Sequence, residues 1–198
     1  MAKAQPKKRE RLVEADRRAQ LLELGLGAFG SRSYDAVSID DLAKEAKVSK
    51  GLLYHYFPTK RAYYVAALRL AASRLLAETE TLPTLAPLDR ALGGLVAYLD
   101  FAERHAPAFI TLMNGGIGAD SEVAVVIEGT RQVFIERMLE GRAKTTGKRA
   151  DAALRLMVRG FVGFVEATCI EWIGDRSVTR EDLLALWMRA LVGLFGPA

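Results

Sequence analysis

The sequence is poor in the residues that support disulfides, metal sites and membrane spans. Its 198 residues include one cysteine, Cys169, and two histidines, His55 and His105. A single cysteine excludes an intramolecular disulfide framework, and no Cys/His cluster suggests a zinc site. No apolar run approaches the ~20 residues of a membrane span, and no signal peptide is recognisable. We therefore expect a cytoplasmic protein without a cofactor, a metal ion or a membrane partner.

Proline and β-branched runs are also scarce, and no segment has the pattern of a strand. Apolar residues make up 51% of the chain and charged residues 26%, which is enough for a sizeable core. The abundance of Ala, Leu, Glu and Arg favours helix. We expect an all-α fold of about nine helices, with one large domain or two small ones.

Apolar residues spaced three and four apart predict the helices. Pro58 and the segment from Leu82 to Pro87 interrupt the pattern, so a helix from Lys60 to about Glu80 stands between two modules. Asn114 to Gly118 is expected to be a flexible joint. The other predicted helices are Arg11 to Phe29, two short ones between Ser38 and Phe57, Leu88 to His105, Pro107 to Met113, Ser121 to Lys144, Arg149 to Gly174 and Thr179 to Phe195.

The segment from Ser38 to Phe57 has the layout of a helix-turn-helix. Ser38 stands three residues before Asp41, as in a capping box, and Ser49 can cap the second helix after a turn at Lys47 and Val48. Such a pair of helices places the second one in the DNA major groove. A helical hairpin of an ordinary core is the alternative, but the joint pattern favours DNA binding.

The second helix, from Ser49 to Tyr56, has a composition that suits a groove. Lys50 can reach a base edge or a phosphate, and Gly51 leaves room where the backbone would approach DNA. Tyr54 and His55 can donate hydrogen bonds to phosphate oxygens. Either Leu52 or Leu53 packs inward, and the other can touch a thymine methyl group.

On these residues, the segment from about Arg17 to Leu76 resembles the DNA-binding domain of the TetR family of bacterial transcriptional repressors. The residues that carry the resemblance are Ser38, Ala43, Ala46, Val48-Ser49, Gly51, Tyr54, Tyr56-Phe57 and Lys60. Two positions depart from the family pattern: Lys47 stands where glycine is frequent, and Leu53 where a small hydroxyl residue is common.

The resemblance implies a DNA-binding domain over residues 12–60, with its motif at 38–57, and a helical effector-binding and dimerisation domain over 61–198. It implies a double-stranded DNA operator as partner. The DNA-contacting residues expected in the helix-turn-helix region are Ser38, Ser49, Lys50, Gly51, Leu53, Tyr54, His55 and Lys60.

The net charge of +4 is concentrated at the N-terminus. Residues 1–11 carry five basic side chains and one acidic one, whereas basic and acidic groups balance in the rest of the chain. We expect a flexible basic arm over 1–11, with Arg9 and Arg11 on DNA phosphates. A solvated terminus without this role is the alternative.

A homodimer is expected because two helices related by a twofold axis read a palindrome. In the family, the last two helices of each subunit form the interface. We expect Gly160 and Gly163 to let helices approach closely and apolar stripes of the last helix to pack across the interface: Leu183, Leu184, Trp187, Met188, Leu191, Leu194 and Phe195. Burial of these stripes within the monomer is the alternative.

A pocket for a small effector is the weaker expectation, because aromatic residues and methionines at helical spacing are usually core. A group of them favours an apolar or aromatic effector. The candidates are Tyr98, Phe101, Phe109, Met113, Phe134, Met138, Met157, Phe161, Phe164 and Glu166. Glu166 also needs a partner such as Arg131, Arg159 or a helix end, or a ligand's positive charge.

The function most consistent with the sequence is a ligand-released repressor. A constitutive DNA-binding or architectural protein is the main alternative. An enzyme is not expected, because no nucleophile–base set, metal-ligand spacing or phosphate-binding loop is present.

Overall fold

The computed structural model describes residues 6–82, 84–106, 109–110 and 120–195, and the side chains from residue 14 onward. Within these ranges the chain forms eight helices and no strand, which confirms the all-α class. None of these helices is long and apolar enough to cross a lipid bilayer. Their bounds are α1 (Pro6–Ser31), α2 (Ile39–Glu45), α3 (Lys50–Tyr56), α4 (Lys60–Glu78), α5 (Pro87–Arg104), α7 (Ser121–Thr146), α8 (Ala152–Asp175) and α9 (Arg180–Phe195).

Hydroxyl side chains fix the starts of the three helices that follow α1. The Oγ atom of Ser38 accepts a hydrogen bond from the backbone N–H of Asp41 (3.3 Å), and that of Ser49 accepts one from Leu52 (3.0 Å). Thr59 Oγ1 accepts one from the N–H of Ala62 (2.9 Å) at the start of α4. Each such cap contributes about 1 kcal/mol to helix stability. The helix-turn-helix of the sequence analysis therefore forms where its polar caps predict it.

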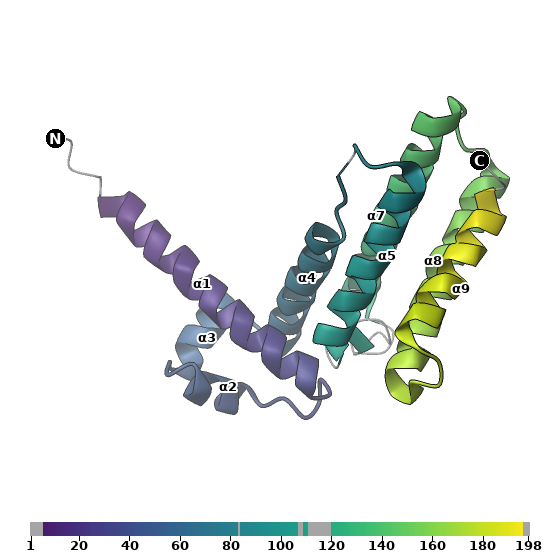
Figure 1. The fold of residues 1–198 in the computed structure, drawn as a ribbon. Helices are drawn as coiled ribbons and strands as arrows, with labels where there is room; N and C mark the ends of the chain where they lie inside the picture. The colour runs from purple at the N-terminus through teal and green to yellow at the C-terminus, as the bar shows by residue number, and fades with distance from the viewer. Residues whose placement is uncertain (1–5, 83, 107–108, 111–119, 196–198) are drawn as a thin grey trace.

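α1 starts earlier than the periodicity predicted. Its backbone is helical from Pro6, so most of the expected flexible arm over 1–11 belongs to a helix. Proline suits the first helical position, and the Lys, Arg and Glu residues that follow are good helix formers. The N-terminal half of α1 extends beyond the other helices (Figure 1). The side chains of Arg9 and Arg11 lie outside the described part of the structure.

α4 connects the helix-turn-helix domain to the helical bundle. Its first half packs on α1, α2 and α3, where Tyr63 and Leu68 share an apolar cluster with Leu21 and Phe29. Its last turns reach the second cluster through Leu75, which packs among residues of α5, α8 and α9. Figure 1 shows α4 between the small helices at the lower left and the bundle of α5, α7, α8 and α9. A movement of the bundle can therefore reach α3 through α4.

The predicted helix from Pro107 to Met113 is described only at Phe109 and Ile110, and the joint from Asn114 to Gly118 lies outside the described residues. The other predicted helices agree closely with the structure.

Candidate nucleic-acid interface and ligand cavity

The turn between α2 and α3 is closed by the backbone alone. The N–H of Val48 donates to the carbonyl of Ala43 (3.0 Å), and that of Lys47 donates to Lys44 (3.0 Å). Lys47 adopts a φ of 54°, which lies in the left-handed region that glycine tolerates best. The family's frequent glycine at this position thus has a conformational reason, and Lys47 adopts the same turn at some cost.

One face of α3 is open to solvent. Lys50, Gly51, Tyr54 and His55 are exposed on it, as a DNA-reading helix requires. The expected DNA contact from Leu53 is wrong: this side chain is only 1% exposed. It packs in the apolar cluster of the helix-turn-helix, one helical turn before the equally buried Phe57. Leu52, which is 37% exposed, is the leucine on the outer side.

Gly51 has no packing partner that would require a glycine. A Cβ atom built there would meet only Ser49 Oγ, at 3.9 Å. The small size of residue 51 is therefore not needed by the fold of the single chain. It is explained if a surface outside the chain approaches α3 at this point.

The basic groups around α3 have weak partners in the unbound protein. The Lys50 ammonium lies 2.9 Å from a carboxylate oxygen of Asp40, and this contact raises the pKa of Lys50. His55 Nε2 lies 3.9 Å from a carboxylate oxygen of Glu14. The Lys60 ammonium lies 4.5 Å from the centre of the Tyr34 ring. All of these are exposed or partly exposed, so phosphate oxygens can replace the present partners.

An ion pair joins the start of α4 to the start of α7. Arg61 holds both carboxylate oxygens of Asp120, with Nη2 donating over 2.9 Å, and Nη1 also donates to Glu122 over 2.8 Å. The guanidinium lowers the pKa of Asp120 to about 2. Asp120 also caps α7 by accepting from the N–H groups of Glu122 and Val123. This ion pair therefore connects the helix-turn-helix domain to the helical bundle at the point where α7 begins.

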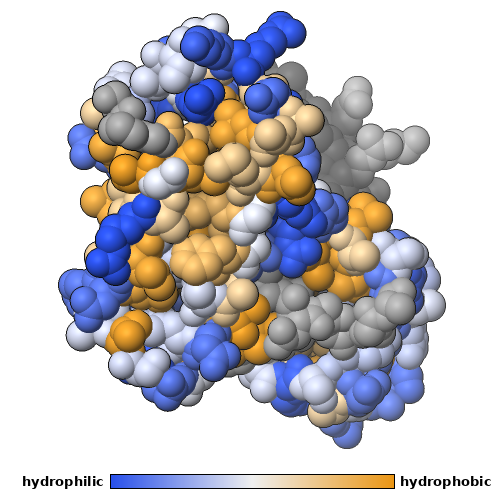
Figure 2. All heavy atoms as spheres, turned by 90° about the vertical axis from the view of Figure 1, so that its right-hand side faces the viewer, coloured by the Kyte–Doolittle hydropathy of each residue, from blue (hydrophilic) through white to orange (hydrophobic). Residues whose placement is uncertain are grey.

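The outward face of α8 and α9 is apolar. Leu156 is 74% exposed and Met157 47%, and α9 contributes Leu186. Figure 2, which views the right-hand side of Figure 1, shows a broad apolar area crossed by few charged side chains. Gly160 and Gly163 are exposed on α8, and a Cβ at either would meet no atom within 4 Å.

Most of the α9 residues expected at a dimer interface face their own subunit. Leu183, Leu184, Trp187 and Leu191 are buried in the second apolar cluster, and Trp187 Nε1 donates to Thr168 Oγ1 (2.8 Å). These four assignments are wrong because this side of α9 packs against α5 and α8 of the same chain. Partly buried residues of α9 also pack against the chain's own core: Met188, Leu194 and Phe195.

A cavity of about 960 Å³ opens between α5, α7, α8 and α9, next to the end of α4. Its apolar wall includes Leu95 and Val165. Five of the predicted effector residues line it: Tyr98, Phe134, Met138, Phe161 and Glu166.

The other predicted effector residues do not line this cavity. Phe101 and Phe109 are buried in the neighbouring core, and Phe164 packs at the edge of the same cluster. Met157 lies on the outward face of α8, which corrects its assignment. Met113 lies outside the described residues.

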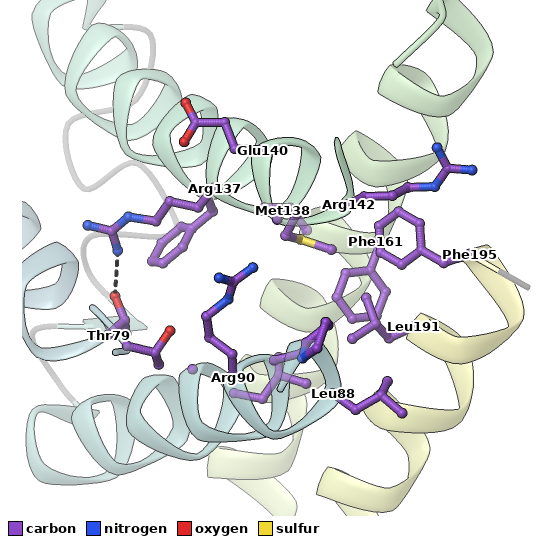
Figure 3. A pocket seen from close by; sticks show the side chains of 18 of the residues that line it. Thr79, Leu88, Arg90, Arg137, Met138, Glu140, Arg142, Phe161, Leu191 and Phe195 are labelled. Atoms are coloured by element: carbon purple, nitrogen blue, oxygen red, sulfur yellow. Dashed lines mark hydrogen bonds between the residues drawn. The ribbon is translucent and has the colours of Figure 1, made fainter. Parts of the chain in front are cut away.

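The charged part of the cavity wall was not predicted from the sequence. Arg90 of α5 and Arg137, Arg142 and Lys144 of α7 line it, and Figure 3 shows Arg90 projecting from α5 toward α7. They could not be predicted because Arg90 is distant in the sequence from the three residues of α7, and because nothing distinguishes them in the sequence from the many arginines and lysines of the surface.

Glu166 is buried and paired. Arg131 Nε donates to both of its carboxylate oxygens (3.0 and 2.8 Å), so Arg131 is the partner among the alternatives that the sequence left open. Burial raises the pKa of Glu166, while the guanidinium acts in the opposite sense. Glu166 lines the cavity, but its charge is already matched. Cys169 is also buried, and burial raises its pKa to about 12, as expected of a structural thiol.

Two family models match the chain. Residues 21–67 match the model for bacterial regulatory proteins of the tetR family, and residues 87–194 match the tetracycline repressor-like C-terminal domain. Among solved structures, a TetR-family transcriptional regulator from Streptomyces coelicolor is 30% identical, with a TM-score of 0.79 over 91% of this chain and 80% of that one.

The chain is also similar to characterised transcriptional regulators. The chain is 29% identical to the HTH-type transcriptional repressor KstR of Mycobacterium tuberculosis, over 91% of this chain and 83% of that protein. It is 25% identical to the HTH-type transcriptional activator FasR of Mycolicibacterium smegmatis, over 87% of this chain and 80% of the relative. With both halves matched, an all-helical fold and an exposed α3, the chain belongs to the TetR family of DNA-binding transcriptional regulators.

Proposed function

We propose that this regulator is a cytoplasmic homodimeric repressor that binds a palindromic operator and releases it when a small molecule enters the cavity. The open face of α3 carries the proposal, because Gly51 is unexplained by packing and lies beside Lys50, Tyr54 and His55. Of the two relatives, KstR is named a repressor and FasR an activator, and for the direction of regulation we follow KstR.

The apolar face of α8 and α9 supports the dimer. Exposed Leu156 and Met157 beside Gly160 and Gly163 form a surface on which a second helix pair can pack closely. A patch of this kind is unusual on a monomer. In this proposal the exposed residues of α8 and α9 form the interface. The buried residues of α9 pack against the chain's own core.

The contacts of α4 suggest how the cavity controls α3. At its start, α4 is tied to α7 by Arg61 and Asp120. At its end, Arg137 of α7 donates to the carbonyl of Leu76 (3.0 Å) and to Thr79 Oγ1 (3.3 Å). Because Arg137 and Thr79 also line the cavity, a bound molecule can favour one placement of α4 over another. The two α3 helices then lose the spacing that fits adjacent major grooves.

The DNA contacts are tested by gel shift with the promoter region of the protein's own gene. We expect Gly51→Glu to weaken binding about a hundredfold or more, equivalent to about 3 kcal/mol, because a carboxylate would face the phosphates. Tyr54→Ala should also weaken it. Gly129→Glu is the matched control, since Gly129 is exposed on α7 with no atom within 4 Å of an added Cβ. Equal binding by Gly51→Glu and Gly129→Glu would contradict the α3 contacts.

The dimer is tested by analytical ultracentrifugation. Leu156→Arg should shift the protein toward monomer without lowering its helical content, because Leu156 is 74% exposed in the single chain. Val125→Arg on α7 is the control, at a residue that is 67% exposed. A Leu156→Arg protein that stays dimeric would show that this face is not the interface.

A further inference from the structure

The arginines of the cavity differ from the other arginines of the molecule in their partners. Within the described side chains, eight arginines are partly buried: Arg61, Arg74, Arg90, Arg131, Arg137, Arg142, Arg159 and Arg180. Five of them pair with carboxylates, and the three without a described carboxylate partner are Arg90, Arg137 and Arg142. All three line the cavity. A partly buried guanidinium is costly without an anion, so this arrangement is one that a bound anion would complete.

Arg90 is the most central of the three. Figure 3 shows its guanidinium in the space between α5 and α7, whereas Arg137 points toward Thr79 and Arg142 lies near Phe195. A Cβ atom at Gly141 of α7 would lie 2.5 Å from the Arg90 Nη2 atom. Gly141 is thus the position on α7 over which the guanidinium of Arg90 rests.

The rest of the wall suits the body of an organic molecule rather than a free inorganic ion. Leu95, Phe134, Phe161 and Val165 surround the space beyond Arg90. Tyr98, eight residues or about 12 Å of helix beyond Arg90, is buried, and its hydroxyl has no partner among the described groups. An unpaired buried hydroxyl in a cavity wall marks a place for a ligand's polar atom.

We propose that the cavity binds an amphipathic anion, with its carboxylate or phosphate group on Arg90, assisted by Arg142, and its apolar body among α5, α7 and α8. The assignment rests on the proposed role of the cavity as the effector site, and it replaces the apolar or aromatic effector expected from the sequence. Glu166 does not oppose it, because Arg131 holds both oxygens of that carboxylate. Glu80 and Glu140 are exposed where they line the cavity, so water screens them.

The proposal is tested by calorimetric titration of the full chain without DNA. The probes are dodecanoate and dodecyl phosphate, below the concentrations at which they form micelles, against dodecanol and against acetate. We expect at least one of the two anionic chains to bind about tenfold or more tightly than dodecanol, and acetate not to bind measurably. The tighter of the two identifies the head group. Dodecanol binding as tightly as both anions would overturn the proposal.

Variants assign the head group to Arg90. Arg90→Gln should lower the affinity for the anionic chain about tenfold and leave the affinity for dodecanol unchanged. Gly141→Ala should act in the same direction without removing a charge, because the added methyl group displaces the guanidinium. Arg149→Gln, at an exposed arginine outside the cavity, is the control. Circular dichroism checks that each variant is folded. Equal anion affinity in Arg90→Gln and Arg149→Gln would overturn the assignment.

Gel shifts with the promoter DNA separate this proposal from the proposed function. A protein that prefers the anionic chain but never binds the DNA would overturn the repressor and support the anion site. A protein that binds DNA but shows no preference for the anionic chain would overturn the anion site and support the repressor.

Discussion

Lys50 and Asp40 form a contact across the α2–α3 turn that DNA must compete with. The ammonium lies 2.9 Å from one carboxylate oxygen and 3.0 Å from the other. Both side chains are half exposed or more, so the pair contributes little to stability. Its main effect is expected on DNA binding, because the carboxylate neutralises a cation and itself repels phosphate.

We predict that Asp40→Asn binds the promoter DNA about three- to tenfold more tightly, with a steeper dependence on salt concentration. Fluorescence anisotropy at several salt concentrations measures both quantities. Asp41→Asn is the control, because Asp41 pairs with Lys44 in its own helix rather than with Lys50. Similar affinities for the two variants would show that the Lys50–Asp40 contact does not limit binding.

At the scale of single residues, the sequence predicted what depends on local chemistry. Ser38 and Ser49 cap their helices as their positions implied. Leu52 and Leu53 could not be told apart, because α3 has only seven residues and its apolar pattern is too short to fix the inward face. Only packing against α1 and α4 decides that Leu53 is the buried one.

At the scale of helices, the junction of α4 and α7 depends on charge. The pKa of Asp120 is lowered to about 2 by Arg61, from about 3.9 in an unfolded chain. A lowered pKa means that this group's stabilising contribution is present above about pH 4 and is lost as pH falls toward 2. Asparagine caps a helix about as well as aspartate, so Asp120→Asn removes the charge and keeps the cap.

We therefore predict that Asp120→Asn lowers the melting temperature at pH 7, and that the difference from the unchanged protein shrinks between pH 4 and pH 2. Thermal unfolding followed by circular dichroism at stepped pH checks this. Asp89→Asn, in the exposed first turn of α5, should show a smaller difference. A difference for Asp120→Asn that is constant with pH would contradict the ion pair's role.

The bounds of the helices could be predicted from their caps and from helix-breaking residues. Which side of each helix is buried could not. α9 carries more apolar residues than one face requires, and the sequence did not tell which of them meet the chain's own core. The structure buries Leu183, Trp187 and Leu191 and leaves Leu186 outside. That choice depends on how α9 packs against α5 and α8, which is a tertiary property.

At the scale of the whole molecule, the cavity combines residues that are distant in the chain. Phe134 and Phe161 could be predicted because bulky apolar residues at helical spacing mark interior positions. Arg90, Arg137 and Arg142 could not, since a sequence does not show which arginines lack a carboxylate neighbour. The charged wall of the cavity is visible only once the helices are assembled.

Above all, we propose that two copies of α3 read one twofold-symmetric DNA site. Nuclease footprinting on the promoter region of the protein's own gene tests it most directly. We predict one protected, palindromic site whose half-site centres lie one helical turn, ~34–36 Å, or a multiple of it apart. The footprint should be absent with Gly51→Glu and present with Gly129→Glu. No symmetric footprint, or an unchanged footprint with Gly51→Glu, would contradict the claim.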